Sequence, residues 1–76
     1  MSPKLPRITA RDLVRALRRA GWYDDRQVGS HLTLRHPNRP GAVQVPMHVG
    51  DVLAPKTLQS ALDQAGMTTD ELRELL

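Results

Sequence analysis

The sequence predicts a small α+β domain with a helix, a three-stranded antiparallel sheet, a second helix and a short C-terminal helix. Apolar residues recur at helical spacing before residue 21 and after residue 55, and they alternate with polar residues in between. Glycine and proline separate these segments where a helix or strand has to end. The 76 residues leave room for one domain, which we assign to residues 1–76, and the absence of cysteine excludes disulfides and thiolate metal sites.

The first helix is predicted to begin at Thr9, because Thr9 and Asp12 have the spacing of a capping box. Gly21 supplies the helix end, where a left-handed residue is favoured. One face of this helix is apolar and consists of Ala10, Leu13, Val14, Leu17 and Ala20. The same period gathers four arginines on the opposite face, namely Arg11, Arg15, Arg18 and Arg19.

Three short strands are predicted after this helix, at Trp22–Arg26, Ser30–Arg35 and Ala42–Val45. Turns are expected between them, at Val28–Gly29 and at Pro37–Gly41. The short connections favour an antiparallel meander, since parallel neighbours would need a long crossover.

The second strand has two chemically different faces. Leu32 and Leu34 point to one face, and His31, Thr33 and Arg35 point to the other, because successive side chains alternate along a strand. One face of the sheet is therefore expected to lie against the core, and the other to be polar and open to solvent.

A second helix is predicted from Pro55 to Ala65, with Gly66 as its end, and the capping box of Thr68–Glu71 begins a short third helix. Both main helices should cover the leucine and valine face of the sheet. This order, α-β-β-β-α, is the double-stranded-RNA-binding-domain-like arrangement. Trp22 and Tyr23 are expected to pack against the helices, since the core has no phenylalanine; stacking on bases is the alternative.

Charge is distributed unevenly along the chain. Residues 1–48 carry nine Lys/Arg and three Asp/Glu, whereas residues 49–76 carry two Lys/Arg and five Asp/Glu. A basic half on a small domain favours an anionic polymer or an acidic protein as partner, because arginine binds phosphate and carboxylate in bidentate geometry. A solvated, solubilising surface is the other interpretation.

Histidines are the best candidates for chemistry. His31 lies on the open face with Arg35, and an imidazole there could take the proton of an RNA 2′-hydroxyl while the arginine holds a phosphate. An ordinary surface histidine remains the alternative. His36 is expected at a surface turn and His48 in a loop, and the three histidines lack the spacing of a metal site.

A series of short motifs along almost the whole chain resembles the HicA toxin family. The matching pieces are Gly21-Trp22, Gly29-Ser30-His31, Arg35-His36-Pro37, Val45-Pro46-Met47-His48, Thr57-Leu58 and Ala65-Gly66. The resemblance implies a double-stranded-RNA-binding-like fold and ribosome-independent cleavage of mRNA. Since the chain has no cluster of metal ligands, we expect this cleavage to need neither a metal nor a cofactor. The resemblance also implies neutralisation by a HicB-type antitoxin, and it makes the histidine of Gly-Ser-His, here His31, the catalytic residue.

The expected site follows from this resemblance together with the charge pattern. Around His31, the candidate substrate contacts are Gly29, Ser30, Arg35, His48, Lys56, Arg15 and Arg19, with Lys4 as a further cation. The start of the chain lacks the apolar segment of a signal peptide, and no apolar run is long enough for a membrane span, so we expect a cytoplasmic protein. The alternatives are a non-catalytic RNA-binding module and a domain whose basic face docks an acidic protein.

Overall fold

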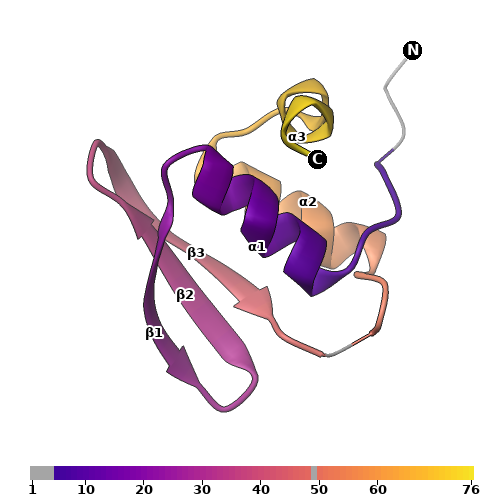
Figure 1. Cartoon of the computed structure of the whole chain (residues 1–76), viewed down its shortest axis with the longest axis horizontal. Coiled ribbons are helices and arrows are strands. Elements are labelled where there is room, and N and C mark those ends of the chain that lie inside the picture. The colour runs from indigo at the N-terminus through magenta and orange to yellow at the C-terminus, as the bar shows by residue number, and fades with distance from the viewer. Residues whose placement is uncertain (1–4, 49) are drawn as a thin grey trace.

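The computed structural model describes residues 5–48 and 50–76, which form three helices and a three-stranded sheet (Figure 1). The elements are α1 (Ala10–Arg19), β1 (Tyr23–Val28), β2 (His31–His36), β3 (Arg39–Pro46), α2 (Pro55–Ala65) and α3 (Thr69–Leu75). The strands are antiparallel in the order β1-β2-β3, and the helices lie on one side of the sheet. The predicted α+β, double-stranded-RNA-binding-domain-like fold with a short C-terminal helix is confirmed.

Helix α1 begins where the capping box predicts. The Thr9 hydroxyl accepts a hydrogen bond from the backbone N–H of Asp12 at 3.2 Å, and the Asp12 carboxylate accepts one from the N–H of Thr9 at 3.2 Å. The hydrogen bond from the Thr9 backbone is the main cause that lowers the pKa of the Asp12 carboxyl. After α1, Gly21 adopts a φ of +101°, which only glycine accommodates readily, and the chain turns toward β1.

The apolar face of the sheet is buried beneath the helices. The side chains of Leu34, Val43 and Val45 are inaccessible to solvent, and those of Leu13 and Leu62 from the helices are equally buried. The other core residues are Ile8, Ala10, Val14, Ala16, Leu17, Trp22, Leu32, Leu58, Ala61, Ala65 and Leu72. Within the described part of the chain, the core contains no buried polar or charged residue, so packing alone stabilises it.

Trp22 and Tyr23 have different environments, although both were expected to pack against the helices. Trp22 is in the core with 4% of its surface exposed, as predicted. Tyr23 is 49% exposed, so the prediction for this residue is wrong. Every residue of β1 is exposed, because β1 is an edge strand that the helices do not cover.

The strand boundaries also differ from those predicted. β1 begins at Tyr23 and includes Val28, so the turn that was expected at Val28–Gly29 is formed by residues 29–30. β3 is longer than predicted, because pairing with β2 begins at Arg39 and the connecting turn contains only residues 37–38. A register shift accommodates the extra residues, and Gly41 lies within it at a φ of +79°.

His36 is half-buried and structural, whereas the sequence suggested a surface turn. Its Nε2 donates to the carbonyl of Ala20 at 3.1 Å, and its Nδ1 accepts from the backbone N–H of Asn38 at 3.0 Å. The ring also packs against Trp22 in a T-shaped arrangement, with a centroid distance of 5.3 Å and an interplanar angle of 67°. His36 therefore connects the end of α1 to the β2–β3 turn.

Helix α2 has the predicted bounds and end signal, and α3 begins after the predicted capping box. Gly66 follows α2 at a φ of +65°, and Thr68 and Glu71 form the capping box of α3, which lowers the pKa of the Glu71 carboxyl. Before α2, the backbone N–H of Leu53 donates to the carbonyl of Ile8 at 2.8 Å. Because Ile8 precedes α1 and Leu53 precedes α2, this bond brings the starts of both helices to one end of the molecule.

Candidate active site

His31 is the first residue of the central strand, and its position is fixed by both neighbouring strands. It is paired with Val28 of β1 and with Pro46 of β3, and its side chain is exposed on the face opposite the helices. Just before it, the carbonyl of Ser30 accepts a hydrogen bond from the backbone N–H of Met47 at 2.5 Å. The imidazole therefore projects to solvent from a rigid backbone, as the strand alternation predicts.

A shallow hollow of about 290 Å³ lies beside His31 on this open face. All three strands contribute to it, and its lining residues are Asp25, Arg26, Val28, His31, Thr33, Arg35, Ala42 and Gln44. Arg26 and Gln44 are both paired with Thr33, so these three side chains form a row across the sheet next to the row of His31. The lining is mostly polar and exposed, which suits an extended polar ligand better than an enclosed apolar one.

Arg35 lies on the same face, as predicted, but some way along the strand from His31. The two residues are four positions apart, so their Cα atoms are separated by about 13 Å at about 3.3 Å per residue. The Nε of Arg35 donates to the Asp25 carboxylate at 3.1 Å, and both side chains are partly exposed. A register shift in β1 between Asp24 and Arg26 occurs at Asp25.

The arginines of α1 fall into two groups. The guanidinium of Arg18 binds the carboxylate of Asp24 through two contacts, at 2.6 and 3.0 Å, and Arg18 thereby lowers the pKa of that carboxyl. Arg19 donates to the backbone carbonyls of Leu75 and Leu76, at 2.7 and 3.2 Å, and so fastens the end of the chain to α1.

Arg11 and Arg15 form the second group. Both are exposed, and both line a hollow of about 200 Å³ together with Val14, Arg18 and Met47. Met47 connects this hollow to the end of the sheet that carries His31, because its N–H binds the Ser30 carbonyl. Arg15, one of the two α1 candidates, therefore lies exposed near the start of β2, whereas Arg19 contacts α3.

The other candidate residues surround the same end of the sheet. Gly29 has a φ of +59° in the turn before β2, and its carbonyl accepts a hydrogen bond from the Gln27 side chain at 3.1 Å. His48 is exposed beyond β3 and lines a separate hollow of about 270 Å³ that also includes Thr57. Lys56 is exposed in the first turn of α2, while Lys4 lies outside the described residues.

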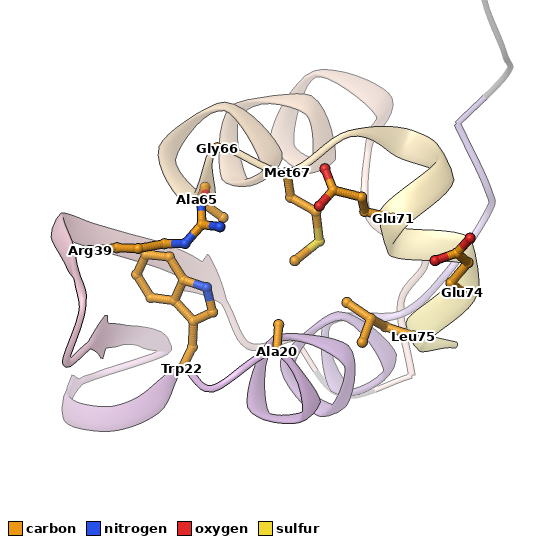
Figure 2. Close-up of a pocket in the computed structure, with 9 residues that line it drawn as sticks. All are labelled: Ala20, Trp22, Arg39, Ala65, Gly66, Met67, Glu71, Glu74 and Leu75. Atoms are coloured by element: carbon orange, nitrogen blue, oxygen red, sulfur yellow. The ribbon is translucent and has the colours of Figure 1, made fainter.

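A second hollow of about 290 Å³ lies among the ends of α1, α2 and α3 (Figure 2). Trp22, Met67 and Leu75 point into it, and Glu71 lies at its border. This hollow is lined by no histidine and is on the helical side of the molecule.

Among residues 5–48 and 50–76, no three metal-binding side chains are grouped, and no helix is long and apolar enough to cross a membrane.

Sequence reasoning missed three polar residues of the open face: Asp25, Arg26 and Gln44. Asp25 lies at a strand irregularity that no local pattern reveals, and Arg26 directly follows it. Gln44 could have been found, because it alternates with the buried Val43 and Val45 in β3.

The fold and this face define a class: a double-stranded-RNA-binding-domain-like domain that presents one histidine on a polar, partly basic sheet. A family model for the HicA toxin of bacterial toxin–antitoxin systems matches residues 10–67, which include all three strands and both main helices. The chain therefore belongs to the HicA toxin family, as its motifs indicated. No curated protein sequence matches the chain significantly.

Proposed function

We propose that this HicA-family toxin is an endoribonuclease that cleaves mRNA in the cytoplasm, with His31 as the catalytic residue. The observation that carries the proposal is the placement of His31: an exposed imidazole on a rigid central strand, beside an open polar hollow. RNA contains its own nucleophile, the 2′-hydroxyl next to each phosphate. A ribonuclease therefore needs a base, cationic groups for the phosphate and correct alignment, all of which side chains can provide without a metal.

In the proposed reaction, an imidazole nitrogen of His31 removes the proton of the 2′-hydroxyl. The 2′-oxygen then attacks the adjacent phosphorus, and the bond from phosphorus to the 5′-oxygen breaks. Water or His48 protonates the departing 5′-oxygen. The products are a 2′,3′-cyclic phosphate and a 5′-hydroxyl end.

The substrate contacts proposed from the sequence have separate tasks along the RNA. Gly29 and Ser30 contact the backbone next to the scissile phosphate, because they immediately precede His31. The sequence alone suggests that Arg35 stabilises charge on the reacting phosphate. Because about 13 Å separates its Cα from that of His31, we assign it instead to a neighbouring phosphate. His48 is the alternative to water as proton donor to the departing 5′-oxygen. The remaining proposed contacts, to phosphates farther along the RNA, are made by Lys56, Arg15 and Arg19.

The partner in this proposal is a HicB-type antitoxin that covers His31. An acidic surface on the antitoxin would match the basic half of the toxin and would accelerate association. Covering an area of the usual size, roughly 800 Å² per partner, would hide about one sixth of a domain whose total accessible surface is 5048 Å². The expected complex inhibits cleavage and shields His31 from solvent.

The decisive experiment compares the wild-type protein with His31→Ala on a defined RNA, with antitoxin removed. The substitution should abolish cleavage and growth arrest while leaving the urea unfolding midpoint nearly unchanged, because the side chain is exposed. An RNA with a 2′-deoxy nucleotide at the cleavage position should resist the wild-type protein. Undiminished cleavage by a folded His31→Ala protein would refute the assignment and favour a non-catalytic RNA-binding module.

A further inference from the structure

The groups closest to His31 are set by strand register. His31 is paired with Val28 in β1, and Arg26 is paired with Thr33, so Arg26 is the diagonal neighbour of His31 on the open face. Diagonal neighbours in an antiparallel pair are roughly 7–8 Å apart, within reach of long side chains. The three pairs from Arg26 to Val28 are in regular register, beyond the irregularity at Asp25.

Arg26 and Arg35 both line the hollow, but they differ in distance from His31 and in bonding. Arg35 is about 13 Å from His31 along its strand and is bound to the carboxylate of Asp25. Arg26 is exposed, and no hydrogen bond or ion pair joins its side chain to any other described residue. Its guanidinium can therefore bind a ligand without first giving up a protein partner.

We infer that Arg26 is a second catalytic residue, which binds the non-bridging oxygens of the scissile phosphate and stabilises the charge that develops there. This inference rests on the proposed ribonuclease function. As the 2′-oxygen attacks, negative charge accumulates on the phosphoryl oxygens, and a guanidinium can donate two parallel hydrogen bonds to them. His31 takes the proton of the nucleophile, and Arg26 contacts the phosphate from the neighbouring strand.

This arrangement assigns different tasks to the two arginines of the hollow. Arg26 acts on the reacting phosphate, whereas Arg35, oriented by Asp25, binds a phosphate farther along the RNA. Loss of Arg26 should therefore affect mainly kcat, and loss of Arg35 should affect mainly KM. On the other side of His31, the equivalent diagonal position in β3 is Gln44, which has no charge to supply.

The test measures kcat and KM on one short RNA for Arg26→Gln, Arg26→Lys and Arg35→Gln. Arg73→Gln in α3 removes the same charge away from the open face and serves as the control. We expect Arg26→Gln to lower kcat about 100-fold or more, as loss of a transition-state hydrogen-bond donor does elsewhere. Arg26→Lys should recover part of that loss, Arg35→Gln should mainly raise KM, and the control should match wild type.

Two outcomes would overturn the inference. One is a kcat for Arg26→Gln within a few-fold of wild type; the other is an equal loss of kcat in Arg26→Gln and Arg35→Gln. Urea unfolding of each variant identifies any loss that comes from misfolding. If His31→Ala abolishes cleavage and Arg26→Gln does not, the inference about Arg26 fails and the proposed function stands; if His31→Ala still cleaves, the proposed function itself fails.

Discussion

Replacement of Gly21 by alanine should destabilise this domain strongly, although it adds only one methyl group. A Cβ at position 21 would lie 2.7 Å from Nε2 of His36 and 3.3 Å from its Cδ2, closer than side chains tolerate. The imidazole cannot move without loss, because it binds the Ala20 carbonyl and the Asn38 N–H and contacts Trp22. The φ of +101° adds strain that any L-residue with a side chain would suffer.

The expected loss of stability can be estimated from these contacts. The positive φ costs about 1–2 kcal/mol for alanine. Displacing His36 forfeits two hydrogen bonds worth about 0.5–1.5 kcal/mol each and an aromatic contact of similar size. Gly21→Ala should therefore lose roughly 3–5 kcal/mol, a large fraction of the roughly 4–11 kcal/mol that a domain of this size has.

Urea unfolding followed by circular dichroism measures this loss, with Gly41→Ala as the matched control. Gly41 also has a positive φ, of +79°, but nothing lies within 4 Å of the position its Cβ would take. The control should cost only the strain, about 1–2 kcal/mol. The double variant Gly21→Ala with His36→Ala should lose less unfolding free energy than the sum of the two single variants, because both substitutions remove the same contacts of His36. Equal losses for Gly21→Ala and Gly41→Ala would refute the reasoning.

Three further predictions concern metal, RNA binding and acid. Cleavage should persist in EDTA; loss in EDTA that one divalent ion restores would contradict the histidine mechanism. Replacing Arg11 and Arg15 by Gln should flatten the salt dependence of RNA binding by roughly 1.4 units, at about 0.7 for each lost phosphate contact, and more than replacing the paired Arg18. Arg18 lowers the pKa of the Asp24 carboxyl in the folded protein. This ion pair therefore stabilises the fold at pH values above the pKa that Asp24 has in the unfolded chain, and the stabilisation is lost as pH falls through the lower pKa of the folded state. Asp24→Asn should therefore make Tm less sensitive to acid.

The helices could be predicted closely because their signals are local. The capping boxes at Thr9 and Thr68 and the stop at Gly66 each involve residues within a few positions of one another, and all three were confirmed. The strand boundaries depend on pairing between distant segments. The sequence therefore did not reveal that the irregularity at Gly41 lets β3 begin at Arg39.

The same contrast explains which parts of the candidate site were predicted. The exposed position of His31 follows from its alternation with Leu32 and Leu34, so it could be predicted from one strand. The neighbours of His31 depend on how β1 is aligned with β2, including the irregularity at Asp25, and no periodicity gives that alignment. The partners of Arg18 and Arg19 likewise depend on how β1 and α3 pack against α1.

Strand β2 contributes both to the packing of the core and to the proposed catalytic site, and substitutions can change one without the other. Leu32 and Leu34 anchor it in a core that holds no polar group among the described residues, while His31 projects to the opposite face. Because alternate residues point to opposite faces, substitutions on the open face leave the core packing intact. A substitution at His31 or Arg26 should therefore change the activity and leave the free energy of unfolding nearly constant. A substitution at Gly21 should lower the free energy of unfolding and leave the open face of the sheet unchanged. The proposed site therefore predicts that single substitutions on the open face of the sheet give folded, inactive variants of the toxin.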